Sequence, residues 1–319
     1  MTKTKTKAKT KETHSLKSVL GPLWSSFSKA SAWEIIIDSF SEVYLIENLK
    51  PTMLKVFKNE AELEKFISAL FKFTKRKLVE GEYSYSMKLD DYTLVNVVLP
   101  PVAMKGPSVV ISKLPTMEVT LDHLIEWKAL TEKGRDQIHA IMNSNRGILV
   151  AGNIGSGKTT LLNTLIHAIP HPNRVVTLER TADLVINRPF VCRLQPQTQK
   201  ADEMISLIEA AEHMRADYVV LSNSIGPEIG TFLEMVRNNC TGVMMMTAVS
   251  VLDAVKRLET KVMLSSDGLS LEETRYAIAQ TLPYLIFQER KADGKRVLSS
   301  IQEIMYEGGE LKLKELYKA

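Results

Sequence analysis

Cysteine is scarce in this chain: Cys192 and Cys240 are the only two among 319 residues, and they lie far apart. Neither belongs to a Cys-x-x-Cys pair, and the six histidines show no metal-ligand spacing. This composition excludes a disulfide-stapled scaffold and gives no support for a structural zinc site. We therefore expect two buried thiols.

Long uncharged apolar runs are also absent, and those present are far shorter than the roughly 20 residues that a membrane-spanning helix needs. The first residues are basic but lack the apolar segment of a signal peptide. We therefore expect a soluble, cytoplasmic protein. With 45% hydrophobic residues, the chain can bury a substantial core, and its length predicts two domains.

Charge is unevenly distributed. The net charge is +4, but residues 1–17 carry six Lys and one Glu, which leaves the remainder near −1. This Lys/Thr segment has no apolar periodicity, so we expect residues 1 to about 17 to be disordered, and residues 1–31 to form a basic disordered tail and a lead-in to the first domain. Such a tail either solubilises the protein or attracts it to anionic lipid. Without arginines or interleaved aromatic residues, it gives little support for nucleic-acid binding.

The rest of the chain is organised around residues 152–160, which fit the pattern Gly-x-x-x-x-Gly-Lys-Ser/Thr of phosphate-binding loops. A strand-like apolar run precedes the pattern and helical spacing follows it, so backbone N–H groups and the helix dipole point at one anion. We predict that Lys158 reaches the β- and γ-phosphates of ATP, or the β-phosphate of ADP, and that the Thr159 hydroxyl holds Mg²⁺. The predicted nucleotide-binding residues are Gly152, Asn153, Ile154, Gly155, Ser156, Gly157, Lys158, Thr159 and Thr160.

The pattern along the chain predicts two domains. Residues 32–112 contain β-rich runs around one amphipathic helix that begins near Asn59, which predicts a small α+β domain. Residues 113–120 are expected to be a linker. In residues 121–319 strands alternate with helices, which predicts an α/β domain with a largely parallel sheet.

The second domain lacks a carboxylate where a P-loop enzyme needs one. Such enzymes place an acidic residue at the end of a neighbouring strand, where it organises Mg²⁺ or the attacking water. The candidate strand, Tyr218–Leu221, is followed by Ser222 and Asn223, and an Asn side chain cannot accept a proton from water. Glu179 and Asp183, after the preceding strand, are the remaining acidic candidates, because strand ends on that side of a parallel sheet converge on the ligand.

From about Trp33 to its end, the chain resembles the CpaF-type (tight-adherence pilus) branch of the type II/IV secretion ATPases. Besides the phosphate loop, the resemblance rests on the opening hairpin Glu34–Leu45, the inter-domain segment Val95–Ser108, the Asp-box segment Val176–Leu184, and Asp253–Glu259 after the His box. It implies a RecA-like P-loop NTPase domain with a mainly parallel sheet, hinged to the N-terminal domain. It also implies a hexamer that couples ATP hydrolysis to pilus assembly or secretion, working with inner-membrane platform proteins.

Compared with that branch, this sequence lacks most catalytic residues. The Walker B Gly-Glu falls on Ser222 and Asn223, so Asn223 takes the place of the catalytic Glu. Other residues also occupy the positions where the branch has arginines, a histidine and a second Asp-box acid: Leu94, Ser112, Lys113, Ile225, Thr247 and Arg180. Glu179 remains, and only the phosphate loop is whole.

These observations favour a secretion-ATPase homologue that binds nucleotide but hydrolyses it poorly or not at all. It would act as a structural or regulatory partner in a homo- or hetero-oligomer. Loss of a general base costs about 10²- to 10⁴-fold in rate, and loss of charge-stabilising arginines adds to this. Two alternatives stay open: an active motor that uses Glu179 as its carboxylate, and a scaffold that no longer binds nucleotide.

Overall fold

The computed structural model describes residues 16–47, 50–114, 118–198, 200–266 and 268–319. The chain divides into two compact units, Met1–Thr116 and Met117–Ala319. Among the described residues, no helix combines the length and the apolar character that crossing a bilayer requires. Cys192 and Cys240 are free thiols of intermediate exposure.

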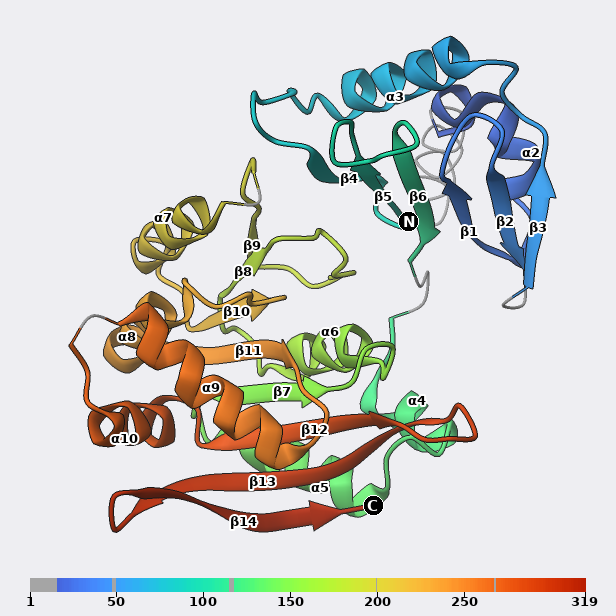
Figure 1. The fold of residues 1–319 in the computed structure, drawn as a ribbon. Helices are drawn as coiled ribbons and strands as arrows, with labels where there is room; N and C mark the ends of the chain where they lie inside the picture. Colours follow the sequence, from blue (N-terminus) through green and yellow to red (C-terminus); the bar gives the residue numbers. More distant parts are fainter. Residues whose placement is uncertain (1–15, 48–49, 115–117, 199, 267) are drawn as a thin grey trace. The chain divides into compact units, whose positions relative to one another are not determined.

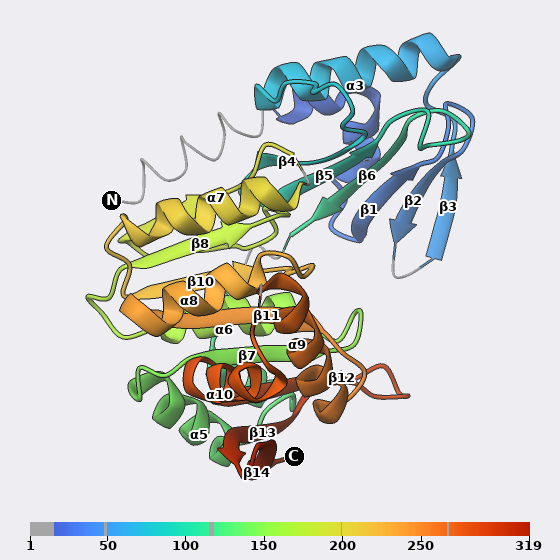
Figure 2. The ribbon, with the colours of Figure 1, turned by 60° about the vertical axis from the view of Figure 1, so that its left-hand side comes forward.

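The first unit is a six-stranded antiparallel sheet in the order β3-β2-β1-β6-β5-β4. One face packs against α3, and Figure 2 shows this helix lying along the sheet. Helix α3 begins after Asn59, whose side chain accepts a hydrogen bond from the Glu62 backbone, as the sequence predicted. The elements are β1 (Ala32–Ile37), β2 (Val43–Glu47), β3 (Lys50–Leu54), α3 (Glu60–Thr74), β4 (Ser84–Asp90), β5 (Thr93–Val98) and β6 (Ser108–Lys113).

The expected start of the folded N-terminal domain at residue 32 is too late. Residues 16–20 are helical and lead into η1 (Gly21–Leu23) and α2 (Trp24–Phe27). Their apolar side chains recur on one helical face and enter the core of the first unit: Leu16, Val19, Leu20, Leu23 and Phe27. The basic Lys/Thr composition just before them obscured this periodicity. Residues 1–15, the rest of the predicted tail, lie outside the described residues.

The second unit is an eight-stranded sheet in the order β14-β13-β12-β7-β11-β10-β8-β9. The six strands from β12 to β9 run parallel, and β13 and β14 add an antiparallel edge, which confirms the predicted α/β fold with a mainly parallel sheet. The strands are β7 (Ile148–Gly152), β8 (Val175–Glu179), β9 (Val191–Leu194), β10 (Tyr218–Ser222), β11 (Thr241–Thr247), β12 (Tyr284–Arg290), β13 (Arg296–Glu307) and β14 (Glu310–Lys318).

Helices cover both faces of this sheet (Figure 1). One core lies under α7 (Ala201–Glu212), α8 (Ile229–Asn239), α9 (Val251–Ser265) and α10 (Leu271–Thr281), and the other under α4 (Leu121–Glu126), α5 (Glu132–Asn143) and α6 (Lys158–Ala168). Because helices cover both faces, β7, β8 and β10 are buried at every residue rather than at alternate ones.

The expected linker, residues 113–120, is too long at both ends. Lys113 is the last residue of β6. Thr120 caps α4 by accepting a hydrogen bond from the His123 backbone, in a capping box. Each end of the predicted linker therefore belongs to a secondary-structure element of its own unit.

Candidate functional site

The phosphate loop lies where the strand β7 turns into the helix α6. Gly157 caps α6 with φ +93°, a left-handed conformation that favours glycine. At Gly152 a Cβ atom would lie 1.9 Å from the carbonyl oxygen of Gln288 on β12, so no side chain fits there. These two glycines let the chain turn tightly against its neighbouring strand and begin a helix whose N–H groups face the loop.

Lys158 is a mostly buried cation with no carboxylate partner among the described residues. Its side chain is 9% exposed, and Nζ donates a hydrogen bond to the Asn153 carbonyl at 2.7 Å. Burial lowers the pKa of Lys158. The hydroxyl of Ser156 is buried and unpaired in the described structure, as is Oδ1 of Asn153. A buried ammonium and an unpaired hydroxyl beside a helix N-terminus fit the phosphates of a nucleotide.

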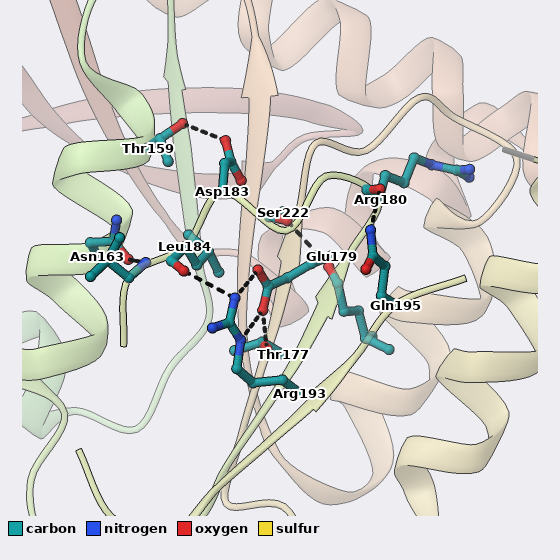
Figure 3. A network of polar contacts seen from close by, with 12 residues as sticks. Thr159, Asn163, Thr177, Glu179, Arg180, Asp183, Leu184, Arg193, Gln195 and Ser222 are labelled. Carbon is teal, nitrogen blue, oxygen red and sulfur yellow. Dashed lines mark hydrogen bonds and ion pairs between the residues drawn. The ribbon is translucent and has the colours of Figure 1, made fainter. Parts of the chain in front are cut away.

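Thr159 and Asp183 meet at this edge of the sheet. Thr159 Oγ1 donates a hydrogen bond to Asp183 Oδ2 at 3.3 Å (Figure 3). The described residues contain no group of three or more His, Cys, Asp or Glu placed to hold a metal ion. That result does not conflict with the predicted Mg²⁺ role of Thr159, because Mg²⁺ usually binds through one or two protein groups, several waters and the substrate phosphates.

Glu179 is a buried carboxylate in an ion pair with Arg193, whose side chain is 32% exposed. It is 1% exposed, and its carboxylate accepts hydrogen bonds from Arg193 Nε at 2.8 Å and from Arg193 Nη2 at 2.6 Å (Figure 3). Thr177 Oγ1 donates a third hydrogen bond, at 2.7 Å, to Oε1. The carboxylate is thus engaged by a guanidinium on β9 and a hydroxyl on its own strand, which opposes its use as a base for water.

Asn223 follows β10 directly and adopts φ +52°, a left-handed conformation that Asn tolerates better than most residues. The strand register places Ser222 opposite Glu179, and Thr247 opposite Gly152. The carboxyl ends of β7, β8, β10 and β11 therefore converge as predicted. They bring Asn223 and Thr247 to the edge, and neither supplies a carboxylate.

Arg180 has a partner that the sequence did not reveal. Its Nη2 lies 3.2 Å from Oε2 of Glu228, and the two side chains are 4% and 0% exposed. Glu228 Oε1 also accepts a hydrogen bond from the Ile225 backbone at 2.9 Å, just before α8. The arginine that stands in the Asp-box segment thus neutralises a buried glutamate, and no local pattern connects the two positions.

Three of the other replaced positions lie in the first unit. Leu94 and Ser112 are neighbours on β5 and β6, and the Ser112 hydroxyl donates a hydrogen bond to Glu34 at 2.6 Å. Lys113 Nζ donates to the Lys29 carbonyl at 2.6 Å. Burial lowers the pKa of Lys113.

The turn between β12 and β13 also reaches the phosphate loop, which the sequence did not predict. Arg296 Nε donates a hydrogen bond to the Gly155 carbonyl at 3.1 Å. Arg290, opposite Arg296 across the hairpin, lies beside the same glycine. The sequence does show two arginines on either side of a turn. It does not show that this turn follows a strand adjacent to β7.

Comparisons with known proteins agree with this geometry. Residues 10–295 match the profile of the type II/IV secretion system protein family. The chain is 27% identical over 204 residues to the conjugal transfer protein TrbB of Rhizobium radiobacter, covering 63% of this chain and 61% of TrbB. It is 31% identical over 141 residues to the protein VirB11 of the same organism, covering 43% of this chain and 41% of VirB11.

A solved structure shows the same fold. The pilus retraction motor PilT with bound ADP superposes with a TM-score of 0.64 at 16% identity, over 88% of this chain and 80% of PilT. The first two conjugal transfer relatives are matched over 61% and 64% of their lengths, less than two thirds in each case. The expected type II/IV secretion family and the RecA-like architecture are confirmed, and the CpaF-type branch stays a prediction. The chain belongs to the type II/IV secretion system protein family.

Proposed function

We propose that this protein binds a nucleotide with Mg²⁺ and hydrolyses it very slowly or not at all, as a structural or regulatory component of a secretion or pilus machine. The observation that carries the proposal is the contrast between Lys158 and Glu179, which both lie at the carboxyl ends of the parallel strands. In the described part of the chain, the ammonium of Lys158 in the phosphate loop has no carboxylate partner, whereas Glu179, one of the two acidic candidates, is paired with Arg193.

Binding is supported by the groups that the described structure leaves unsatisfied. Among the residues that the structure describes, the one acceptor of Lys158 is a backbone carbonyl, and the buried Ser156 hydroxyl has no partner. A buried polar group without a partner costs about 1–3 kcal/mol, and a charged one costs more. An anionic ligand removes this cost, and a nucleotide diphosphate or triphosphate carries the anion that such a loop recognises.

Weak hydrolysis is supported by the groups found at the strand ends in the described part of the chain, where Asn223 stands in the position of the catalytic Glu and Asp183 accepts a hydrogen bond from Thr159. Asn223 can orient a water molecule but cannot take its proton. Glu179 could act as a base only by giving up two charge-assisted hydrogen bonds from Arg193. The alternative of an active motor that depends on Glu179 is therefore disfavoured by the contacts of that residue.

The assembly is proposed from the family. One relative is named a type IV secretion system protein, VirB11 of Bartonella henselae, and it is 28% identical over 179 residues. We propose a homo- or hetero-oligomer, hexameric by the CpaF-type resemblance, at the cytoplasmic side of an inner-membrane platform. Within such an assembly, a subunit that binds nucleotide without turnover would hold an interface in one conformation.

Nucleotide binding is tested by calorimetry and by thermal unfolding with Mg·ATP and Mg·ADP. A ligand at 100 times its Kd adds about 2.7 kcal/mol to stability. We expect a nucleotide-dependent rise in melting temperature that Lys158→Ala abolishes. If the unmutated protein shows no shift at millimolar nucleotide, the proposal fails, and the chain is a scaffold that keeps its loop for packing.

A further inference from the structure

The hairpin of β12 and β13 places two like charges opposite each other. Arg290 and Arg296 are direct partners in the antiparallel register, and both side chains are exposed. Like charges opposite each other on neighbouring strands destabilise a sheet. Among the described residues, neither arginine forms an ion pair with a carboxylate. In the turn between them, Asp293 is paired with Lys295 at 3.1 Å.

This pair lies at the phosphate loop. Arg296 Nε donates to the Gly155 carbonyl, and its Cδ lies 3.3 Å from the position of a Cβ on Gly157. Arg290 Nη1 lies 3.7 Å from the position of a Cβ on Gly155. The register of Gln288 with Gly152 fixes the hairpin at this place, because it extends a strand that pairs directly with β7.

We propose that Arg290 and Arg296 form an arginine clamp that binds the phosphate chain of the nucleotide held by residues 152–159. The inference rests on the proposed nucleotide binding and adds two residues and a second element to that site. One N–H of Arg296 is used to hold the loop, and the remaining guanidinium donors of both residues are suited to phosphate oxygens. The bound phosphates also relieve the repulsion between the two guanidinium groups.

The test measures binding of Mg·ADP and of pyrophosphate to the full chain by calorimetry. Arg290→Ala and Arg296→Ala are each expected to weaken both ligands by about 10- to 100-fold, the range for losing a hydrogen bond between charged groups. Lys291→Ala and Lys295→Ala are matched controls: they remove the same charge from exposed positions of the same hairpin and should change affinity less than about twofold. Arg290→Lys retains the charge without the planar fork and should recover part of the loss.

The melting temperature without ligand separates this role from a structural one. A clamp predicts that Arg290→Ala leaves it unchanged or raises it, because a repulsion is removed. A lower melting temperature with unchanged affinity would show a purely structural role and overturn the proposal. Weaker ADP binding with unchanged pyrophosphate binding would place the arginines on the base or ribose and would also overturn it.

The failure of this proposal is distinguishable from that of the proposed function. If Lys158→Ala abolishes ADP binding and the two arginine variants bind normally, the clamp alone is refuted. If the unmutated chain binds neither ADP nor pyrophosphate, both proposals are refuted.

Discussion

Arg193 donates to both carboxylate oxygens of Glu179, from Nε at 2.8 Å and from Nη2 at 2.6 Å, with the glutamate 1% exposed. The two side chains come from the adjacent parallel strands β8 and β9, and Arg193 stands opposite Thr177 in the register. This pairing stabilises the sheet near its edge and holds the local acid in a fixed, neutralised state. Held in this way, the Glu179 carboxylate is poorly placed to act as a base for water.

The first prediction from this pairing concerns the rate of ATP hydrolysis. Phosphate release from the purified protein should lie at background, and Glu179→Gln should change it by less than about twofold. Asn223→Glu alone should not restore activity, because a base is only one of the groups that P-loop enzymes use. Lys158→Ala serves as the control for contaminating ATPases. Robust hydrolysis lost in both Lys158→Ala and Glu179→Gln would contradict the proposed function.

Lys158 gives a prediction whose sign depends on ligand and pH. Burial lowers its pKa in the folded state, so at neutral pH the folded protein bears the cost of a desolvated ammonium. Without nucleotide, Lys158→Met should therefore melt at a higher temperature than the unmutated protein. With saturating Mg·ADP, it should melt at a lower temperature than the unmutated protein. The unliganded difference should shrink as pH rises through the lowered folded pKa toward the unfolded value near 10.5. Thermal unfolding between pH 7 and pH 10 checks this, and a stabilising effect of Lys158 without ligand would refute it.

The buried pair Arg180–Glu228 predicts a large loss of stability when one partner is removed. Glu228→Gln should destabilise the second unit by about 3–5 kcal/mol, because it removes the charge of a buried carboxylate that lies 3.2 Å from the buried guanidinium of Arg180. The exposed pair Lys312–Glu307 is the control, and Glu307→Gln should cost no more than about 1 kcal/mol. Urea unfolding measures both. Equal effects of the two substitutions would show that Arg180 is satisfied without Glu228.

Leu20 tests the corrected N-terminal boundary. Its side chain is fully buried in the core of the first unit, so Leu20→Ala should destabilise that unit by about 2–5 kcal/mol. The neighbouring Lys17 is exposed, and Lys17→Ala should stay within about 0.5 kcal/mol of the unmutated protein. Denaturant unfolding compares the two variants. If Leu20→Ala left the free energy of unfolding unchanged, residues 16–27 would not be part of the folded core.

The local parts of the site could be predicted from the sequence because their signals are local. The apolar run of β7, the glycine loop and the start of α6 follow one another on the chain, and hydrophobic periodicity with glycine spacing is sufficient to place them. The alternation of strands and helices also predicts the parallel sheet. Asn59 predicted the start of α3 for the same reason, since a helix cap involves residues only three positions apart.

The remaining contacts depend on which strands become neighbours, and periodicity carries no information about that order. Glu179 was identified as an acid, but its partner is known only once β9 is seen beside β8. The pairing of Arg180 with Glu228 joins the end of one strand to the start of a distant helix. Arg296 reaches Gly155 only because β12 lies next to β7, whereas the chain order separates these strands by most of the domain.

The close approach of Gly152 to the Gln288 carbonyl has a consequence for how the protein is made. β12 pairs with β7, the strand that precedes the phosphate loop, but β12 is synthesised long after β7. At a synthesis rate of roughly 10 residues per second, more than about ten seconds separate the two strands. A nascent chain that stops before residue 284 contains the complete phosphate-loop motif without one of its two flanking strands. If the protein binds nucleotide as proposed, the complete site therefore forms only after β12 has been synthesised.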